Sequence, residues 1–585
     1  MPRIWRYEQH DQAKIGDLCR EMRVSPLLAQ VLIARGFPSA DAAEKFLNSK
    51  LTDLHDPELL PGISDAADLV VQALKDQSRI TIYGDYDVDG MTSTSILWHC
   101  LKLAGGQVDY YIPSRIEEGY GLNCDAIREL HEQDPERLLI SVDCGITSVE
   151  EAALANELGL DLIITDHHQM GDQLPAAKVL VHPRLSESQY PFGDLCGAGV
   201  SFKLAWAICQ RLGDGKKASP PMREFLKSAV CLAAIGTIAD VVPLVDENRA
   251  LVRYGLAGLN ELASPGLRAL IKVCGIEKNK SFTASDVGFS IGPRLNAAGR
   301  LGQARLAVEL LTTEDEERAA QLADYLDQLN KNRQTVERRI FKRAKEIVEE
   351  HPEWDSHSAI VIADDDWHPG VIGIVANRVS EHFNKPTFLI AMDSATKIGQ
   401  GSGRTSGNVD LHAAMMSCEE LLEGCGGHKA AAGLRIQADR VDEFRERFSA
   451  YVAEKHDLAE LTEDLKIDAE VLLSDVTYRA IQELNRLGPF GQENSSPVFA
   501  SGRVELAKPA ATMGEGDRHL NVQFEQNGTK LRAIAFGRGE WAEEMNQQSG
   551  TLMISFEPMI NSFRGRESVE LRLLDWKAHE PAATH

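Results

Sequence analysis

An acidic motif in the first quarter of the chain has the composition of a metal site. In GDYDVDG, the carboxylates of Asp85, Asp87 and Asp89 occupy alternate positions directly after the apolar run RITIY. The spacing superficially matches a calcium loop, but the twelfth position from Asp85 is Ile96 instead of Glu, and a strand-like run stands where an EF-hand needs a helix. The motif therefore indicates a hard divalent cation held at a strand end, with coordination positions left for water and phosphate.

Three later apolar runs also end in acidic or histidine residues. Asp143 follows LLISV, Asp166, His167 and His168 follow LIIT, and Asp240 follows GTIA. A single Asp after a strand is commonly a helix cap or a turn residue. Four such segments together predict one metal-dependent phosphodiesterase site. Asp166 either orients His167 or only makes a loop hydrogen bond.

The runs that precede these residues indicate how the site is assembled. Residues 79–83, 138–142 and 160–165 are short, continuous and rich in β-branched residues, and they alternate with helical patterns. This arrangement is typical of a parallel sheet that is covered on both faces. Ligands of open α/β sheets bind beyond the carboxyl ends of the strands, where the acidic and histidine residues stand.

The remainder of the chain predicts one long helix and two further domains. Residues 303–351 contain neither Gly nor Pro, and Thr313 with Glu316 forms a capping-box pattern. The apolar spacing predicts a connecting helix on the order of 55 Å long that ends at Pro352. Strand-like runs around a predicted helix then indicate a second α/β domain. Short alternating strands beyond residue 465, separated by Gly-containing turns, are typical of an OB-type β-barrel.

Composition excludes several classes of protein. Of the 585 residues, 43% are hydrophobic and 26% charged, as in ordinary globular proteins. The ten cysteines form no C-x-x-C pair, which argues against a zinc ribbon and a redox dithiol. No secretory signal or membrane-length apolar stretch is present, so we expect a cytoplasmic protein without membrane contact.

The net charge of −26 opposes nucleic-acid binding unless a local basic surface exists. Residues 331–345 provide such a run, with seven Lys or Arg residues against Glu337. The run is either a DNA-binding surface or a solvated helix face.

The motifs DYDVDG, SVDCGIT, TDHH and GTIADVVPL resemble those of the DHH phosphoesterases. The order of the later segments is similar to that of the RecJ family, bacterial single-strand-specific 5'-to-3' exonucleases, from about Arg79 onward. The residue patterns and this resemblance together predict an α/β multidomain fold with five parts: an N-terminal helical segment (1–78), a parallel-sheet DHH domain (79–302), a long connecting helix (303–351), a DHHA1-type α/β domain (352–455) and an OB-type barrel (456–585).

The resemblance also implies roles for the site residues. His168 would contact the scissile phosphate. Many family members carry a His ligand four residues before the first Asp of the D-x-D pair, where this chain has Tyr83, and Asp85 is the candidate to replace it. Five residues would bind two Mn²⁺ or Mg²⁺ ions: Asp87, Asp89, Asp143, His167 and Asp240.

Several Gly- and Arg-containing segments are candidates for substrate binding. Arg can hold a phosphate through two hydrogen bonds, an aromatic ring can stack on a base, and glycines allow a ligand to approach the backbone. A surface loop is the alternative interpretation for the first segment, and a turn between helices for the second. The candidates in PSRIEEGYGL, IGPRLNAAGR, WHPGVIG, GSGRT and GGHKAAAG are Arg115, Tyr120, Arg294, Asn296, Arg300, His368, Ser402, Arg404 and His428.

The function implied is two-metal hydrolysis of single-stranded DNA from a 5'-phosphorylated end to 5'-mononucleotides, in recombination and repair. Implied partners are single-strand binding protein and a recombination helicase. One alternative is a DHH phosphoesterase of oligoribonucleotides or cyclic dinucleotides, which needs no OB domain. Another is a catalytically inactive replication scaffold, although such relatives have lost ligands that are present here.

Overall fold

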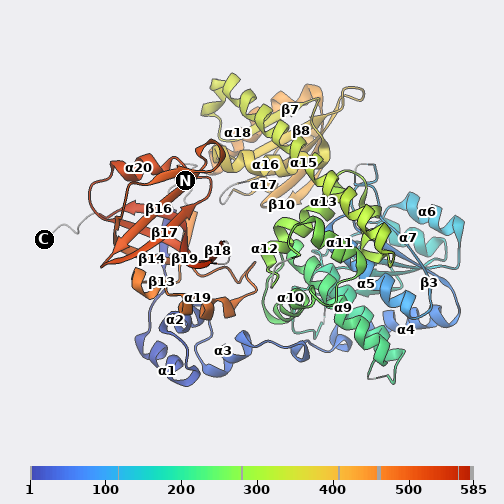
Figure 1. Ribbon diagram of the computed structural model, residues 1–585. Helices are drawn as coiled ribbons and strands as arrows, with labels where there is room; N and C mark the ends of the chain where they lie inside the picture. The colour runs from blue at the N-terminus through green and yellow to red at the C-terminus, as the bar shows by residue number, and fades with distance from the viewer. Residues whose placement is uncertain are drawn as a thin grey trace. The chain divides into compact units, whose positions relative to one another are not determined.

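The computed structural model describes residues 3–579 except 116, 187, 216, 278–280, 406–408, 457–462 and 564–565. The chain divides into two compact units (Figure 1). The first combines Met1–Ser49 with Thr462–His585, and the second is Lys50–Leu461. No helix within the described ranges is both long enough and apolar enough to cross a membrane.

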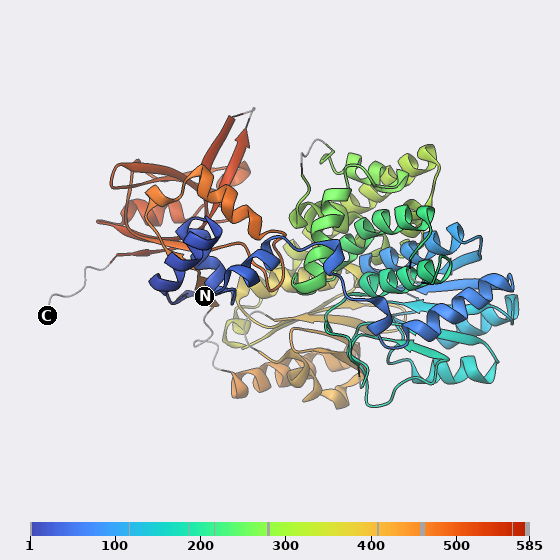
Figure 2. The same cartoon turned by 90° about the horizontal axis from the view of Figure 1, so that it is seen from below.

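The second unit begins with the predicted parallel sheet. All three predicted strands are present, and two more extend the sheet, in the order β3-β2-β4-β5-β6. Helices lie on both of its faces (Figure 2), which explains why the strands are continuous apolar runs. The strands are β2 (Arg79–Gly84), β3 (Gln107–Tyr111), β4 (Leu138–Val142), β5 (Asp161–Thr165) and β6 (Val179–Val181).

Helices that precede, separate and follow these strands in the sequence pack on the sheet and complete its core. One face packs on helices before and between the first strands and on a helical block after β6. The other face packs on two short helices between the strands. The helices are α4 (Ile63–Lys75), α5 (Val88–Leu103), α6 (Cys124–Gln133), α7 (Val149–Glu157), α8 (Gly197–Arg211), α9 (Pro220–Ala239), α10 (Asp246–Gly258), α11 (Pro265–Val273), α13 (Gly292–Arg300) and α14 (Ala304–Thr312).

The long helix begins later than predicted. Residues 303–351 form two helices, α14 and then α15 (Glu316–Glu350), so the single helix expected from the absence of Gly and Pro is wrong at its start. Asp315 caps α15 by accepting hydrogen bonds from the backbone N–H groups of Glu317 and Arg318, and Thr313 does not form the predicted capping box. The 35 residues of α15 span about 52 Å, and the helix ends before Pro352 as expected.

The second α/β domain follows α15. Its five-stranded sheet has the order β10-β11-β9-β8-β7, in which only β7 and β8 are parallel. Helix α16 joins these two strands, as the sequence predicted. The elements are β7 (Ile360–Asp364), α16 (Pro369–Phe383), β8 (Thr387–Met392), β9 (Ile398–Arg404), α17 (Leu411–Met416), β10 (Leu422–His428), β11 (Ala431–Gln437) and α18 (Val441–Lys455).

The first unit contains the predicted OB-type barrel. Its seven-stranded sheet closes on itself through an additional pairing of β14 with β16. The strands are β13 (Ala469–Glu470), β14 (Phe499–Leu506), β15 (Ala511–Met513), β16 (His519–Gln526), β17 (Thr529–Ala535), β18 (Leu552–Phe563) and β19 (Arg566–Ala578).

The first 78 residues differ from the predicted helical segment in two ways. The chain begins with a strand, β1 (Arg3–Tyr7), that pairs in parallel with β12 (Glu463–Ile467). Helices α1 (Gln12–Met22), α2 (Pro26–Ala34) and α3 (Ala40–Leu47) share one apolar core with the barrel, whereas α4 packs on the sheet of the second unit. These contacts join segments far apart in the sequence and therefore leave no local pattern.

Candidate metal centre and phosphate pocket

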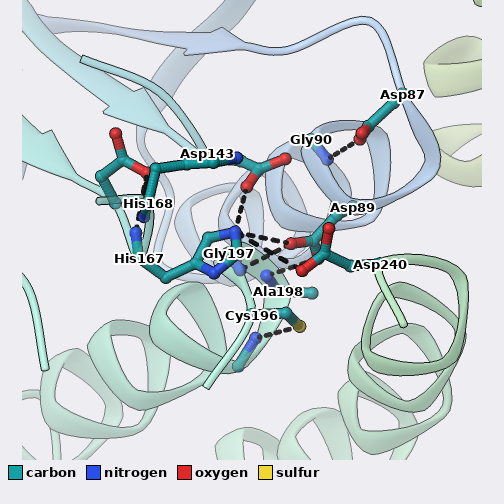
Figure 3. A network of polar contacts seen from close by, with 12 residues as sticks. Asp87, Asp89, Gly90, Asp143, His167, His168, Cys196, Gly197, Ala198 and Asp240 are labelled. Carbon is teal, nitrogen blue, oxygen red and sulfur yellow. Dashed lines mark hydrogen bonds and ion pairs between the residues drawn. The ribbon is translucent and has the colours of Figure 1, made fainter. Parts of the chain in front are cut away.

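The carboxyl ends of β2, β4 and β5 bring the predicted acidic and histidine residues together (Figure 3). Asp87 and Asp89 lie at the start of α5, and Asp143 follows β4 in a left-handed conformation with φ of 62°. His167 follows β5. Asp240 joins them from the carboxyl end of α9, so four segments distant in the sequence supply one cluster.

His167 lies between three carboxylates. Its Nε2 is 3.1 Å from Asp143 Oδ1, 3.7 Å from Asp89 Oδ2 and 3.6 Å from Asp240 Oδ2. His167 Nε2 and Asp143 Oδ1 are buried, and neither makes a hydrogen bond of normal geometry among the described residues. An imidazole nitrogen that lies among carboxylate oxygens without a hydrogen bond to them fits the site of a divalent cation that takes N and O ligands.

The ligand atoms form overlapping groups. Asp89, His167 and Asp240 offer atoms within 4.8 Å of one another, and so do Asp85, Asp87 and Asp143. Asp143 lies in both the second group and a third group formed with the TDHH motif. The donor set therefore fits two Mn²⁺ or Mg²⁺ ions, with Asp143 placed to serve both.

Charge repulsion within this cluster is not relieved by protein cations alone. Burial and then the charges of Asp89 and Asp87 raise the pKa of Asp240 to about 8. Burial and then the charge of Asp89 also raise the pKa of Asp143 and that of Asp87, and burial lowers the pKa of His167 to about 4. His167 is therefore neutral at pH 7 and free to ligate, while the carboxylates require added positive charge.

Asp89 is held by a helix terminus that the sequence reading missed. Its Oδ2 accepts a hydrogen bond from the Gly197 N–H at 2.6 Å and its Oδ1 one from the Ala198 N–H at 2.8 Å, at the positive end of α8. A Cβ on Gly197 would lie 2.5 Å from Asp143 Oδ1, and one on Gly236 would lie 2.5 Å from Asp89 Oδ1. The small residues in CGAG and AIGT were the available signal.

Asp166 supports His168 more than the ring of His167. Its Oδ1 accepts hydrogen bonds from the backbone N–H of both histidines and lies 2.7 Å from His168 Nδ1. Burial opposes a charge on His168, but the hydrogen bond to Asp166 raises the pKa of His168 to about 9. His182, another residue the sequence reading missed, places its Nε2 2.8 Å from the backbone oxygen of His168. His168 is thus a fixed cation at pH 7.

Tyr83 is a structural residue in this chain. Its buried hydroxyl donates a hydrogen bond to the Gly121 carbonyl at 3.1 Å, so it is directed into the protein. Asp85 Oδ1 is buried without a hydrogen-bond partner among the described residues. Burial and the charge of Asp87 raise the pKa of Asp85. Because Asp85 lies beside Asp87 and Asp143, it is still the candidate for the ligand that Tyr83 does not supply.

Arg115, Arg300 and Arg404 form a second cluster of like charge, which we call the guanidinium cluster. Burial and then repulsion from Arg115, Arg333 and Arg404 lower the pKa of Arg300 to about 10. Arg404 Nη1 lies 3.2 Å from Ser402 Oγ. In the described part of the chain, no carboxylate forms an ion pair with any of the three. Half-buried cations that lie close together without carboxylate partners indicate an anion site.

Tyr86 and Tyr120, whose ring centres lie 6.4 Å apart, connect the two clusters. The Arg115 guanidinium lies 5.1 Å from the centre of the Tyr86 ring, one residue before Asp87. Tyr120 OH donates to the Asp143 carbonyl at 3.2 Å and lies 3.2 Å from His168 Nδ1. Its side chain is half exposed at 51%, so the ring can still meet a ligand.

The remaining predicted binding residues are Arg294, Asn296, His368 and His428. Arg294 forms an ion pair with Asp327 at 2.8 Å, which leaves it less available for phosphate. His368 caps α16 by accepting from the Gly370 N–H, and His428 is exposed at the end of β10. Asn296 is half buried on α13. The roles of these four residues in substrate binding stay predictions.

The residues predicted as a basic surface are largely paired with acids. Lys331 pairs with Asp327, Arg333 with Glu337, Lys342 with Glu346, and Arg343 with Glu350 and Asp364. The run therefore has less free positive charge than the sequence suggested.

The sheet, the metal cluster and the attached domains define a phosphoesterase of the DHH class. Family models match in three places: the DHH family N-terminal domain at residues 79–237, the DHHA1 domain at 356–454 and the RecJ OB domain at 467–575.

The single-stranded-DNA-specific exonuclease RecJ of Bacillus subtilis is 38% identical, over 98% of this chain and 70% of the relative. That of Escherichia coli is 33% identical, over 93% of this chain and 95% of the relative. The crystal structure of Thermus thermophilus RecJ with Mn²⁺ matches with a TM-score of 0.83 at 33% identity, covering 99% of this chain and 80% of that one. A second structure of the same enzyme contains Mg²⁺. The chain belongs to the RecJ family.

Proposed function

We infer that this protein is a single-stranded-DNA-specific exonuclease that uses Mn²⁺ or Mg²⁺ and releases 5'-mononucleotides from a 5' end. One observation carries this inference: unneutralised carboxylates and unneutralised guanidinium groups meet at the β2–α5 loop, where Asp85 and Asp87 flank Tyr86 and Arg115 stacks on the Tyr86 ring. The first requires metal ions and the second requires an anion. A terminal phosphate and the next phosphodiester of one strand meet both requirements.

The chain's own residues bind and orient the substrate in this account. When bound, the divalent ions stabilise negative charge on the phosphate and lower the pKa of water. The α8 N–H groups fix Asp89, and the protonated His168 donates a hydrogen bond to a phosphate oxygen. Arg115, Arg300 and Arg404 hold the terminal phosphate, so that the bond one nucleotide inward lies at the metal cluster. The 5' polarity follows from this order.

Digestion of single strands labelled at the 5' phosphate tests the function. We expect labelled mononucleotides from the first turnovers with Mn²⁺, slower digestion when the end carries a hydroxyl, and no digestion of a blunt duplex. Labelled oligonucleotides as first products, or equal rates on the duplex, would contradict the assignment. A small-substrate phosphoesterase would instead leave long strands intact and digest only short oligonucleotides.

We also propose the wider setting that the sequence suggested. Single-strand binding protein and a recombination helicase would be partners in recombination and repair, and the protein would act in the cytoplasm, where bacterial DNA lies. The barrel supports the longer substrate because OB folds bind single strands by stacking and charge. The domain limits 79–302, 303–351, 352–455 and 456–585 remain our proposed functional divisions.

A further inference from the structure

A buried ion pair lies behind the metal cluster. Lys203 of α8 and Glu247 of α10 have side chains with no solvent exposure, and Lys203 Nζ is 2.6 Å from Glu247 Oε2. Lys203 Nζ also donates to the backbone oxygen of His55 at 2.6 Å, and the Tyr190 hydroxyl donates to Glu247 Oε1. Removing two charges from water opposes folding unless the geometry satisfies them fully, so a pair at this depth needs an explanation beyond stability.

Each member of the pair lies on an element that supports the metal cluster. Lys203 is on α8, whose first N–H groups hold Asp89. Glu247 is in the first turn of α10, at the end of the turn that Asp240 begins. The ion pair therefore joins α8, which holds Asp89, to the segment that carries Asp240.

Two further contacts make the same connection. Asn248 Nδ2 donates to the Asp194 carbonyl at 2.6 Å, just before α8, and to the Pro243 carbonyl at 3.0 Å, inside the turn. Cys196 Sγ, at the cap of α8, lies 3.4 Å from Thr237 Oγ1 near the end of α9. These contacts join the two ends of the 240–246 turn, at Thr237 and at Glu247 with Asn248, to α8 and the residues just before it.

The turn itself contains two residues in an unfavourable backbone conformation. Val241 and Asp246 have positive φ values of 59° and 45°, and this region is unfavourable for a β-branched residue such as Val. Such a conformation persists only where surrounding contacts determine it. Among the described residues, the Asp240 side chain makes no hydrogen bond and has only the 3.6 Å contact with His167, so its direction depends on the turn.

We propose that Lys203 and Glu247 are positioning residues for the metal site, which lock the turn carrying Asp240 onto the helix that holds Asp89. This inference rests on the proposed function only in treating the acidic and histidine cluster as the metal site. The pair touches neither metal nor DNA. Its loss should therefore lower metal affinity and kcat while leaving the KM for DNA unchanged.

The test measures Mn²⁺ affinity of the full chain from the electron paramagnetic resonance signal of free Mn²⁺. Lys203→Met with Glu247→Met removes both charges while keeping apolar volume, which commonly preserves folding. We expect a melting temperature near that of the wild type but Mn²⁺ binding weakened about tenfold or more, as for other residues that orient ligands. A Kd within about twofold of the wild type would overturn the proposal.

Arg137→Met is the matched control. Arg137 is also buried and donates to Thr81 Oγ1 at 2.8 Å, but it lies just before β4, at the opposite end of the strands from the metal cluster. If the double variant melts lower, its Mn²⁺ affinity is compared with that of Arg137→Met. Weakening in the pair variant alone supports positioning, and equal weakening in both overturns it. Wild-type protein that binds Mn²⁺ yet leaves DNA intact would refute the proposed function and not this inference.

Discussion

Two groups of basic residues in the second unit differ in what neutralises them. On α15, most Lys and Arg residues between 331 and 345 pair with acids on the same helix or on β7. In the guanidinium cluster, the described residues provide no carboxylate partner, and Arg300 is repelled by its arginine neighbours. A run of positive charge in the sequence is thus weaker evidence for a phosphate site than three arginines that folding brings together. The metal cluster is likewise formed by like charges that folding brings together, in this case carboxylates.

Removal of a central carboxylate should have the largest effect. Asp89→Ala should lower nuclease activity by about a thousandfold or more, because a divalent metal stabilises the transition state by several kcal/mol. Circular dichroism should show a folded protein. Asp125→Ala, at an exposed position on α6, is the control and should retain full activity. Substantial Mg²⁺-dependent activity of Asp89→Ala would refute the ligand assignment.

Replacing one arginine of the guanidinium cluster should reduce the preference for a 5'-phosphorylated end more than replacing one arginine of α15. Arg404→Gln should weaken the preference for a 5'-phosphorylated end by about tenfold to a hundredfold, the value of hydrogen bonds to a charged group. Arg343→Gln, which removes a residue already paired with acids, should change it little. Competition between phosphorylated and hydroxylated strands measures both. Equal losses would mean that α15 is a phosphate-binding surface after all.

The number of bound Mn²⁺ ions tests whether Asp85 is a ligand of the second ion. Asp85→Asn should reduce the number of bound Mn²⁺ ions from two to one in equilibrium dialysis, whereas Tyr83→Phe should leave two because its hydroxyl points toward Gly121. If Asp85→Asn still binds two ions, Asp85 is not the substitute for the missing histidine.

The negative cluster predicts a pH dependence of the metal's effect on stability. The pKa of Asp240 is raised to about 8 in the metal-free fold, from about 3.9 when unfolded. Its contribution to metal-free stability is therefore present below about pH 4 and is lost as the pH rises through about 8. Mn²⁺ should raise the melting temperature more at about pH 8.5 than at about pH 5.5. A shift that is larger at the lower pH would contradict the direction of the pKa change.

The smallest effect concerns backbone strain. Val241→Gly should raise the free energy of unfolding of the metal-free protein by about 1 kcal/mol, because Gly adopts the observed φ of 59° without strain. Val242→Gly, next in the chain, should lower it. Denaturant unfolding with EDTA compares them, and a less stable Val241→Gly would show that its side chain contributes more than the strain costs.

The sequence predicted those site residues that follow a strand. Parallel strands end at the same edge of a sheet, so residues that directly follow them in the chain lie close together. Asp143 and His167 are of this kind. It could not predict that Gly197 and Ala198 hold Asp89, since that contact depends on where α8 packs. The ion pairs of α15 with β7 and the packing of α1–α3 on the barrel also join distant segments, and the break before α15 depends on one capping aspartate.

A crystal structure with Mn²⁺ and thymidine 5'-monophosphate tests the central claim most directly. We expect two anomalous peaks among Asp85, Asp87, Asp89, Asp143, His167 and Asp240, and a phosphate bound by Arg115, Arg300 and Arg404. Manganese bound elsewhere, or a nucleotide phosphate seated on α15, would contradict it.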